Sequence, residues 1–268
     1  MISSNILTFY KKDKDGKVII ETLNEHVNLC LEFFKKFKET RFWKSINIDL
    51  KEKYAEFAII YHDVGKIFYQ KHLIKDKDHG IEYLSFRGHE FISTWMLKIV
   101  LEKRIKEIIL SGMDEKIVAD IDLLSKSAQF AVLYHHHAMD IKERLKELDF
   151  INLRELTQEE YQILSKDFSS IYKIKLEDID SSFNNFLCNK NEMNRKLIEI
   201  KSSIKDINAE IWKAYNTSPF NKKVMLTFLL ALIYVDYKAS KTSRSHPEEI
   251  PSFFINVINE IDNYAYYL

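Results

Sequence analysis

The chain has 268 residues, of which 46% are hydrophobic, enough for one large domain with a sizeable core. Its 40 basic residues balance 40 acidic ones, which excludes a protein that coats nucleic acid through a global positive field. With only 5 Gly and 3 Pro, the composition favours long helices over many short strands. Cys30 and Cys188 lie far apart and outside any CxxC motif, so we expect no disulfide framework and a reducing cytoplasm.

Neither secretion nor membrane insertion is predicted. The N-terminus lacks the basic region and following apolar run that make a signal peptide. The longest apolar stretch, residues 224–235, is shorter than the roughly 20 residues that span a bilayer. Asp236 ends this stretch, which we interpret as a buried helix.

The first predicted element is a short extended or hairpin piece within residues 1–20, with its turn at residues 14–17. Apolar residues then recur at helical spacing over residues 21–38. His26 lies at the edge of that apolar face, beside the expected core.

Two further helices are predicted on either side of a loop at residues 76–80. The first covers residues 50–64, and Gly65 stands where a C-cap glycine belongs. The second begins near Gly88 and continues through apolar residues to about Val100.

The second half of the chain is also predicted to be helical. An apolar stripe predicts a helix over residues 114–136. Residues 140–215 are more polar, predict shorter helices and form a candidate accessory insertion. Ser218 and Pro219 start a further helix as N-cap and first helical residue, and prolines within residues 247–251 bound a last helix.

The strongest chemical signal is the run Tyr-His-Asp-Val-Gly-Lys at residues 61–66, at the end of a predicted helix. His62 and Asp63 can offer an imidazole nitrogen and a carboxylate to neighbouring metal ions, and Asp63 can bridge two ions. Gly65 lets the chain turn, which places Lys66 to meet a phosphate. A His-Asp dipeptide alone is common by chance, whereas His-Asp-x-Gly-Lys at a helix end is much more specific than a polar helix terminus.

Further histidines strengthen the case for a metal site. His135, His136 and His137 follow a strongly apolar helix, where imidazoles are costly to desolvate unless they bind something. The alternative is a solvent-exposed cluster just past the helix. His89, followed by Glu90, opens another predicted helix, and alone it fits a capping or surface histidine equally well.

The assignment of Asp236 and His26 as metal ligands depends more on their surroundings in the sequence. Asp236 continues the helical spacing of the apolar residues 229–233, where a carboxylate is disfavoured unless it is paired or binds a metal. The alternative is an ion pair with Lys238 or Arg244. His26 alone would be a hydrogen-bonded core histidine. It becomes a candidate metal ligand only through its order in the chain relative to the other candidates. Together the set offers nitrogen and oxygen ligands for two divalent ions, without a thiolate.

These residues resemble the signature of the HD superfamily of metal-dependent phosphohydrolases, which is a His, then His-Asp, then a late Asp. More narrowly, they resemble the HD nuclease of CRISPR type I interference. That family has a His in its first helix, His-Asp-x-Gly-Lys, His-Glu followed by Ser, a double His after a hydrophobic helix, and a late Asp followed by a small residue and Ser. The matching residues here are His26, His62, Asp63, Gly65, Lys66, His89, Glu90, Ser93, His135, His136, Asp236, Ala239 and Ser240.

The resemblance implies an all-α HD-domain helical bundle, in a single domain over residues 1–268 with the extended N-terminal piece. It covers about residues 21–140 and 220–245. His137 stands where the family often has a small residue, which leaves open which two of the three consecutive histidines bind metal, and we favour the first two. The chain lacks a GxxxxGK[ST] motif, which implies a stand-alone nuclease subunit served by a separate helicase.

The resemblance also implies two divalent metal ions, with Mn, Mg, Ni and Fe all left open. The two ligand sets share Asp63 and otherwise differ: His26, His62 and Asp236 for one ion, and His89, His135 and His136 for the other. Two such ions can activate a water and neutralise the leaving oxygen, so no protein base is required. Lys66 would offset charge on the phosphoryl oxygens.

The implied function is a cytoplasmic, metal-dependent nuclease that cleaves single-stranded DNA in CRISPR antiviral defence, with RNA as the other candidate polymer and endonuclease or exonuclease action left open. Its implied partners are a separate helicase and the interference complex, and no membrane. An HD phosphohydrolase of nucleotides or cyclic dinucleotides is the alternative enzyme, favoured by a closed pocket over an open groove. A non-catalytic helical scaffold is the weakest hypothesis, because every expected ligand position is filled.

Overall fold

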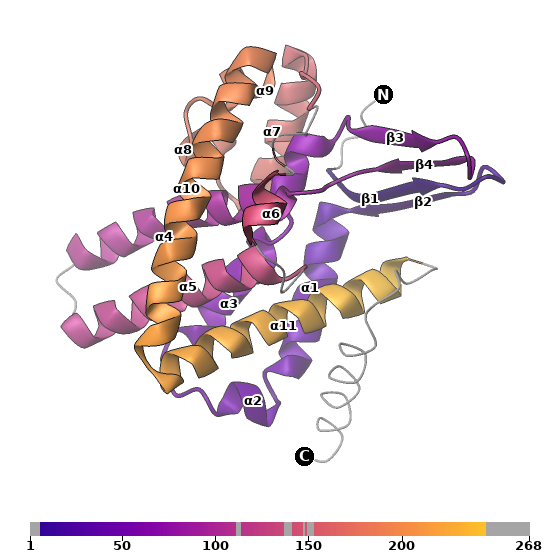
Figure 1. Ribbon diagram of the computed structural model, residues 1–268. Coiled ribbons are helices and arrows are strands. Elements are labelled where there is room, and N and C mark those ends of the chain that lie inside the picture. Colours follow the sequence, from indigo (N-terminus) through magenta and orange to yellow (C-terminus); the bar gives the residue numbers. More distant parts are fainter. Residues whose placement is uncertain (1–5, 111–113, 137–140, 147, 149–152, 245–268) are drawn as a thin grey trace.

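A computed structural model describes residues 6–110, 114–136, 141–146, 148 and 153–244 (Figure 1). The all-α prediction is confirmed: helices form most of the described chain, and a small sheet is added near its beginning. The predicted last helix and His137 lie outside the described residues. None of the helices in the described part is both long and apolar enough to cross a membrane.

The sheet consists of two antiparallel hairpins in the strand order β2-β1-β4-β3. Its strands are β1 (Leu7–Lys12), β2 (Val18–Thr22), β3 (Leu73–Asp76) and β4 (Ile81–Leu84). The predicted N-terminal hairpin is confirmed, with Lys12 opposite Val18. The predicted loop at residues 76–80 is the turn of the second hairpin, whose strands were missed because four residues are too few for a period-two pattern.

The helix α1 (Leu23–Phe37) follows β2 directly and agrees with the prediction. A capping box at Thr22 and Glu25 starts it, because each side chain accepts a hydrogen bond from the other residue's backbone N–H. The short α2 (Arg41–Lys44) leads to α3 (Lys51–Tyr61).

The end of the predicted second helix is wrong. The α-helix stops at Tyr61, and a 3₁₀ helix, η1 (Val64–Tyr69), carries Gly65 within it. Gly65 is not among the glycines with positive φ, so it is no left-handed cap. A Cβ there would lie 2.2 Å from the carbonyl oxygen of His89 and 2.9 Å from Ser93 Oγ. The glycine is therefore required by the close approach of η1 to the following helix.

The centre of the molecule is built on two long helices, α4 (His89–Leu110) and α5 (Glu115–Tyr134), which lie side by side (Figure 1). The range of α5 agrees with the prediction, whereas α4 starts as predicted but continues ten residues beyond Val100. Asp114 caps α5 through the backbone N–H of Lys116. The last described helix, α11 (Pro219–Ser243), has the predicted Ser218 cap and packs along α5 and α1.

Residues 140–215 include short helices, as predicted, but also one long helix. The short ones are α6 (Ile141–Leu145), α7 (Gln158–Tyr172), α8 (Leu176–Ile179) and α9 (Phe183–Leu187). The long one, α10 (Lys190–Thr217), packs on α4, α5 and α11. It buries a narrow stripe that the polar composition concealed, namely Met193, Leu197, Ile200, Ile204, Ile207 and Ile211. The accessory insertion stays a prediction.

Candidate metal centre

The ends of several helices meet at one place and bring together all the predicted ligand residues. His62 and Asp63 lie between α3 and η1, and His89 is the first residue of α4. His26 comes from the first turns of α1, and Asp236 from the last turns of α11. The remaining two ligands follow the last residue of α5: His135 and His136.

One half of the centre, which we call the α1 half, contains His26, His62 and Asp236. The Nε2 atoms of His26 and His62 are 3.3 Å apart. Asp236 Oδ1 lies 3.1 Å from His26 Nε2 and 3.8 Å from His62 Nε2. Arg244 was one of the two basic residues considered as an ion-pair partner of Asp236. In the structure Arg244 donates to Glu21.

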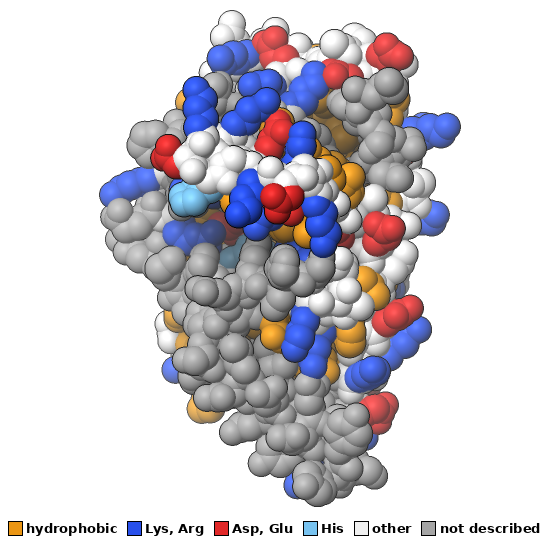
Figure 2. Space-filling model, turned by 90° about the vertical axis from the view of Figure 1, so that its right-hand side faces the viewer, with side chains coloured by type: hydrophobic (Ala, Val, Ile, Leu, Met, Phe, Trp, Pro, Cys, Tyr) orange, Lys and Arg blue, Asp and Glu red, His pale blue; other side chains and the backbone are white. Residues whose placement is uncertain are grey.

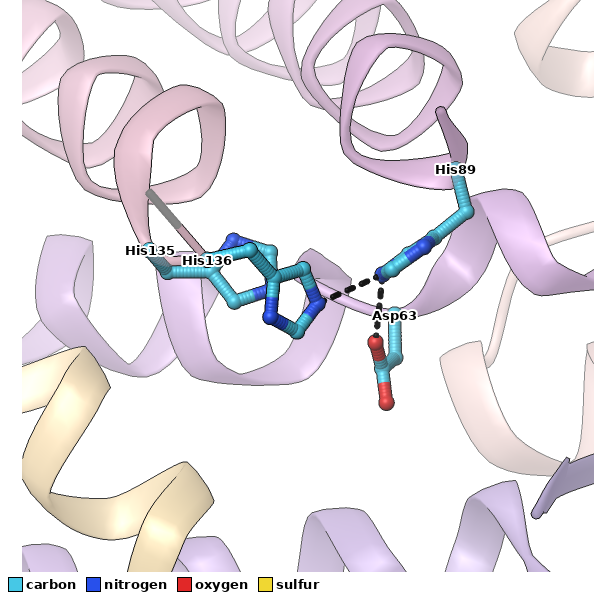
Figure 3. Close-up of side chains that lie close together, drawn as sticks. All are labelled: Asp63, His89, His135 and His136. Atoms are coloured by element: carbon cyan, nitrogen blue, oxygen red, sulfur yellow. Dashed lines mark hydrogen bonds and ion pairs between the residues drawn. The ribbon is translucent and has the colours of Figure 1, made fainter. Parts of the chain in front are cut away.

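The other half, which we call the α5 half, contains His89, His135 and His136 around Asp63 (Figure 3). His89 Nε2 is 3.0 Å from Asp63 Oδ1 and 3.1 Å from His136 Nε2. The four side chains each offer one ligand atom, and these atoms all lie within 4.8 Å of one another. A single divalent ion could therefore contact all four.

The carboxylate of Asp63 lies between the two halves. Its Oδ1 faces His89, whereas its Oδ2 lies 3.6 Å from His26 Nε2 and 3.5 Å from His62 Nε2. Burial raises the pKa of Asp63, but Lys66, His62 and His89 together outweigh burial and hold the pKa well below its ordinary value. The side chain is thus a carboxylate with one oxygen available to each half.

Lys66 holds this carboxylate in place. Its Nζ donates to Asp63 Oδ2 at 2.8 Å and to the carbonyl oxygen of Thr8 at 3.3 Å. The side chain is buried, and its ammonium lies over the ring of Phe86. In this structure Lys66 therefore contacts the candidate bridging ligand directly.

Three of the histidines are oriented by the backbone. The Nδ1 atoms of His62, His89 and His135 each lie within hydrogen-bond distance of a carbonyl oxygen three residues earlier. These oxygens and their distances are Ile59 at 2.7 Å, Phe86 at 2.6 Å and Val132 at 2.7 Å. Because a carbonyl oxygen only accepts, Nδ1 carries the proton, and the lone pair is on the Nε2 that faces the centre.

His26 is oriented by a side chain instead. Its Nδ1 lies 3.0 Å from Glu21 Oε1, and Glu21 is buried. Arg244 holds Glu21 from the end of α11 by donating through Nε at 3.0 Å and Nη2 at 2.7 Å. Burial raises the pKa of Glu21, but His26 and Arg244 together have a larger, opposite effect and lower the pKa to about 2. A carboxylate–histidine pair of this kind is a common support for metal ligands.

The α5 half contains acceptors that face one another without a donor. Asp63 Oδ1 and His135 Nε2 are both buried, and neither has a hydrogen-bond partner among the described residues. Burial and the neighbouring His62 lower the pKa of His135 to about 3, so its ring is neutral. Buried acceptors without donors are costly, and a cation between them removes that cost. The residues present therefore fit a divalent metal ion.

The sequence pattern missed Glu21 and Cys30, which contact His26, and considered Arg244 only as a partner of Asp236, whereas Arg244 donates to Glu21. Glu21 and Arg244 are 223 positions apart, and no local pattern links them. Cys30 follows His26 by four residues on the same face of α1, and that spacing was the available signal. The third consecutive histidine, His137, lies outside the described residues, so the preference for the first two stays a prediction.

Comparisons with known proteins complete the description. No family model matches the chain, and no curated protein matches it. Among solved structures, the chain is similar to the CRISPR-associated Cas3 HD domain protein MJ0384 from Methanocaldococcus jannaschii, with 18% identity and a TM-score of 0.44. The likeness covers 79% of this chain and 95% of that chain.

Proposed function

We propose that this chain is a metal-dependent phosphodiesterase that cleaves single-stranded DNA. The observation that carries the proposal is the position of Asp63, whose Oδ1 lies beside His89 and whose Oδ2 lies near His26 and His62. A shared carboxylate between two nitrogen-rich groups is the arrangement that a two-metal centre requires. Single-stranded RNA is the other candidate polymer.

Two ions would occupy the two halves of the centre. The first would be held by His26, His62, Asp63 and Asp236, and the second by Asp63, His89, His135 and His136. Divalent ions held there would supply Lewis-acid chemistry, which would activate a water and stabilise the oxygens of a phosphodiester displacement.

The chain's own residues prepare this chemistry. Backbone carbonyls hold His62, His89 and His135 in the tautomer that presents Nε2, and Glu21 does the same for His26. Lys66 fixes the carboxylate of Asp63 and adds a positive charge beside it, where the phosphoryl oxygens would be bound. Because most of these groups are buried, their charges are weakly screened.

Two features favour a nucleic acid as the substrate. The motif resemblance is to nucleases of CRISPR interference, in which a separate helicase and the interference complex would supply the single strand. In addition, Lys and Arg side chains gather on the face shown in Figure 2, around a spot where histidine and acidic side chains are visible. Local positive charge of this kind attracts a phosphate backbone even when the net charge is zero.

The alternative is an HD phosphohydrolase that acts on nucleotides or cyclic dinucleotides. One assay separates the two functions. The purified chain is incubated with labelled single-stranded DNA, duplex DNA, single-stranded RNA, nucleotides and cyclic dinucleotides, each with Mn²⁺, Mg²⁺, Ni²⁺ or EDTA. We expect metal-dependent cleavage of single-stranded DNA that EDTA abolishes. Turnover of the small substrates alone would establish the alternative, and no turnover of any substrate with any ion would contradict both.

A further inference from the structure

Cys30 is buried in the α1 half of the centre, one helical turn after His26. Its Sγ lies 3.6 Å from His26 Nε2. Cys30, His26 and His62 each offer a ligand atom, and the three atoms lie within 4.8 Å of one another. A thiol therefore lies among nitrogen ligands, where the sequence pattern predicted only nitrogen and oxygen.

The distances in this group match one particular coordination geometry. In a tetrahedral site with metal–nitrogen bonds of about 2.05 Å and metal–sulfur bonds of about 2.3 Å, two nitrogens lie about 3.3 Å apart and sulfur lies about 3.6 Å from nitrogen. The observed separations are 3.3 Å between His26 and His62 and 3.6 Å between His26 and Cys30. Asp63 Oδ2, at 3.6 Å and 3.5 Å from the two imidazoles, is the fourth ligand, and Asp236 Oδ1, at 3.1 Å and 3.8 Å, would be a fifth.

A buried cysteine often serves only as a small apolar side chain. That role is available here, because Cys30 also lies 3.7 Å from the carbonyl oxygen of Val235, to which its S–H can donate weakly. The 3.6 Å contact with His26 Nε2 is also a hydrogen-bond distance, so a thiol that only hydrogen-bonds to the imidazole is the second alternative. In neither of these two roles does the sulfur bind a cation.

We infer that Cys30 is a ligand of the metal position formed by His26 and His62, and that it makes this position selective for thiophilic divalent ions such as Zn²⁺ and Co²⁺ over Mg²⁺. Soft thiolate ligands favour such ions, whereas Mg²⁺ binds oxygen ligands and retains water. On binding, the S–H bond breaks, the proton leaves to solvent, and the sulfur lone pair enters the bond to the cation. The inference rests on the proposed metal centre and concerns only its α1 half.

Cobalt spectroscopy tests this inference without an activity assay. The full chain is stripped of metal with EDTA, transferred to anaerobic buffer and titrated with Co²⁺ while the absorption spectrum is recorded. A cobalt–thiolate bond gives an intense charge-transfer band in the near ultraviolet, whereas bound Co²⁺ without sulfur gives only weak visible bands. The chain contains two cysteines, so Cys188→Ser is the matched control for Cys30→Ser.

We expect the charge-transfer band in the native chain and in Cys188→Ser, and its loss in Cys30→Ser with the visible bands retained. Calorimetry should show that Cys30→Ser binds Zn²⁺ and Co²⁺ at least about tenfold more weakly, since removing even an outer partner of a ligand costs 10–100-fold. Its Mg²⁺ affinity should be unchanged.

Two results would contradict the inference in different ways. Visible cobalt bands without a charge-transfer band in the native chain would remove Cys30 from the ligand set and leave the proposed metal centre intact. No cobalt bands at all would contradict the metal centre and, with it, the proposed function. If Cys30→Ser does not fold, the spectra of the native chain and Cys188→Ser still decide, because a band that survives in Cys188→Ser must come from Cys30.

Discussion

The two halves of the candidate centre differ in what holds their ligands. In the α5 half, His89 and His135 bond to backbone carbonyls, which no side-chain substitution removes. In the α1 half, His26 is held by the side chain of Glu21, and a cysteine lies among the ligands. Glu21 in turn accepts hydrogen bonds from Arg244, the residue that follows the last residue of α11. In the α1 half His26 can therefore be tuned by outer side chains, whereas His89 and His135, like His62, are fixed by the geometry of helix ends.

The largest effect should come from Asp63, because it is the one ligand that both halves share. We expect Asp63→Ala to abolish metal-dependent cleavage and to lower metal affinity in both halves, while the fold persists. Cleavage and metal binding are measured beside circular dichroism. Asp122→Ala, which changes an exposed aspartate of α5, is the control and should behave like the native chain. Normal cleavage by Asp63→Ala would reject the assignment.

Single histidine substitutions should separate the two halves. We expect calorimetry with Mn²⁺ to find two ions bound by the native chain and one ion each by His26→Ala and by His89→Ala. Each variant should lose most of its cleavage activity, because an in-line displacement needs both ions. His79→Ala changes an exposed histidine of the β3–β4 turn and is the control. Loss of both ions in either variant would show that the halves do not bind independently.

Glu21→Gln should weaken the α1 half alone. Loss of a carboxylate that hydrogen-bonds to a ligand histidine typically lowers metal affinity by about 10–100-fold. We therefore expect that loss for the ion in the α1 half and an unchanged dissociation constant for the ion in the α5 half. Arg244→Lys keeps a positive charge beside Glu21 and leaves the contact between Glu21 and His26, so we expect a smaller loss of metal affinity from this comparison variant. Equal affinity losses in the two variants would mean that Glu21 acts through stability and not by orienting His26.

The candidate ligands were easier to find in the sequence than the side chains that support them, for a physical reason. Candidate metal ligands at helix ends appear as short local runs, such as residues 61–66, and amphipathic spacing locates the helices that carry them. The support from Glu21 and Arg244 arises only when β2 and the end of α11 meet, which local spacing does not encode. Gly65 shows the same limit, because its role as a close contact of η1 becomes visible only beside His89.

The stripe on α10 was present in the sequence but hidden by its surroundings. Its buried residues recur every three or four positions from Met193 to Ile211, yet the intervening residues are so polar that the segment was predicted to form shorter helices. The opposite holds for β3 and β4, whose four-residue strands carry too little pattern to be recognised. The period of the buried residues was therefore available to show the length of α10, whereas a short hairpin depends on its pairing partners.

The smallest predicted effect concerns the contact between η1 and α4. This contact is the hydrogen bond from the backbone N–H of Gly65 to Ser93 Oγ at 2.8 Å. Ser93→Ala leaves this buried donor unpaired, which should lower the free energy of unfolding by about 1–3 kcal/mol. Since η1 carries Lys66 and α4 carries His89, a small loss of metal affinity should accompany the lost stability. Chemical denaturation and calorimetry measure the two, and Ser127→Ala on α5 serves as a control of similar burial. Unchanged stability in Ser93→Ala would mean that η1 is held against α4 by packing around Gly65 alone.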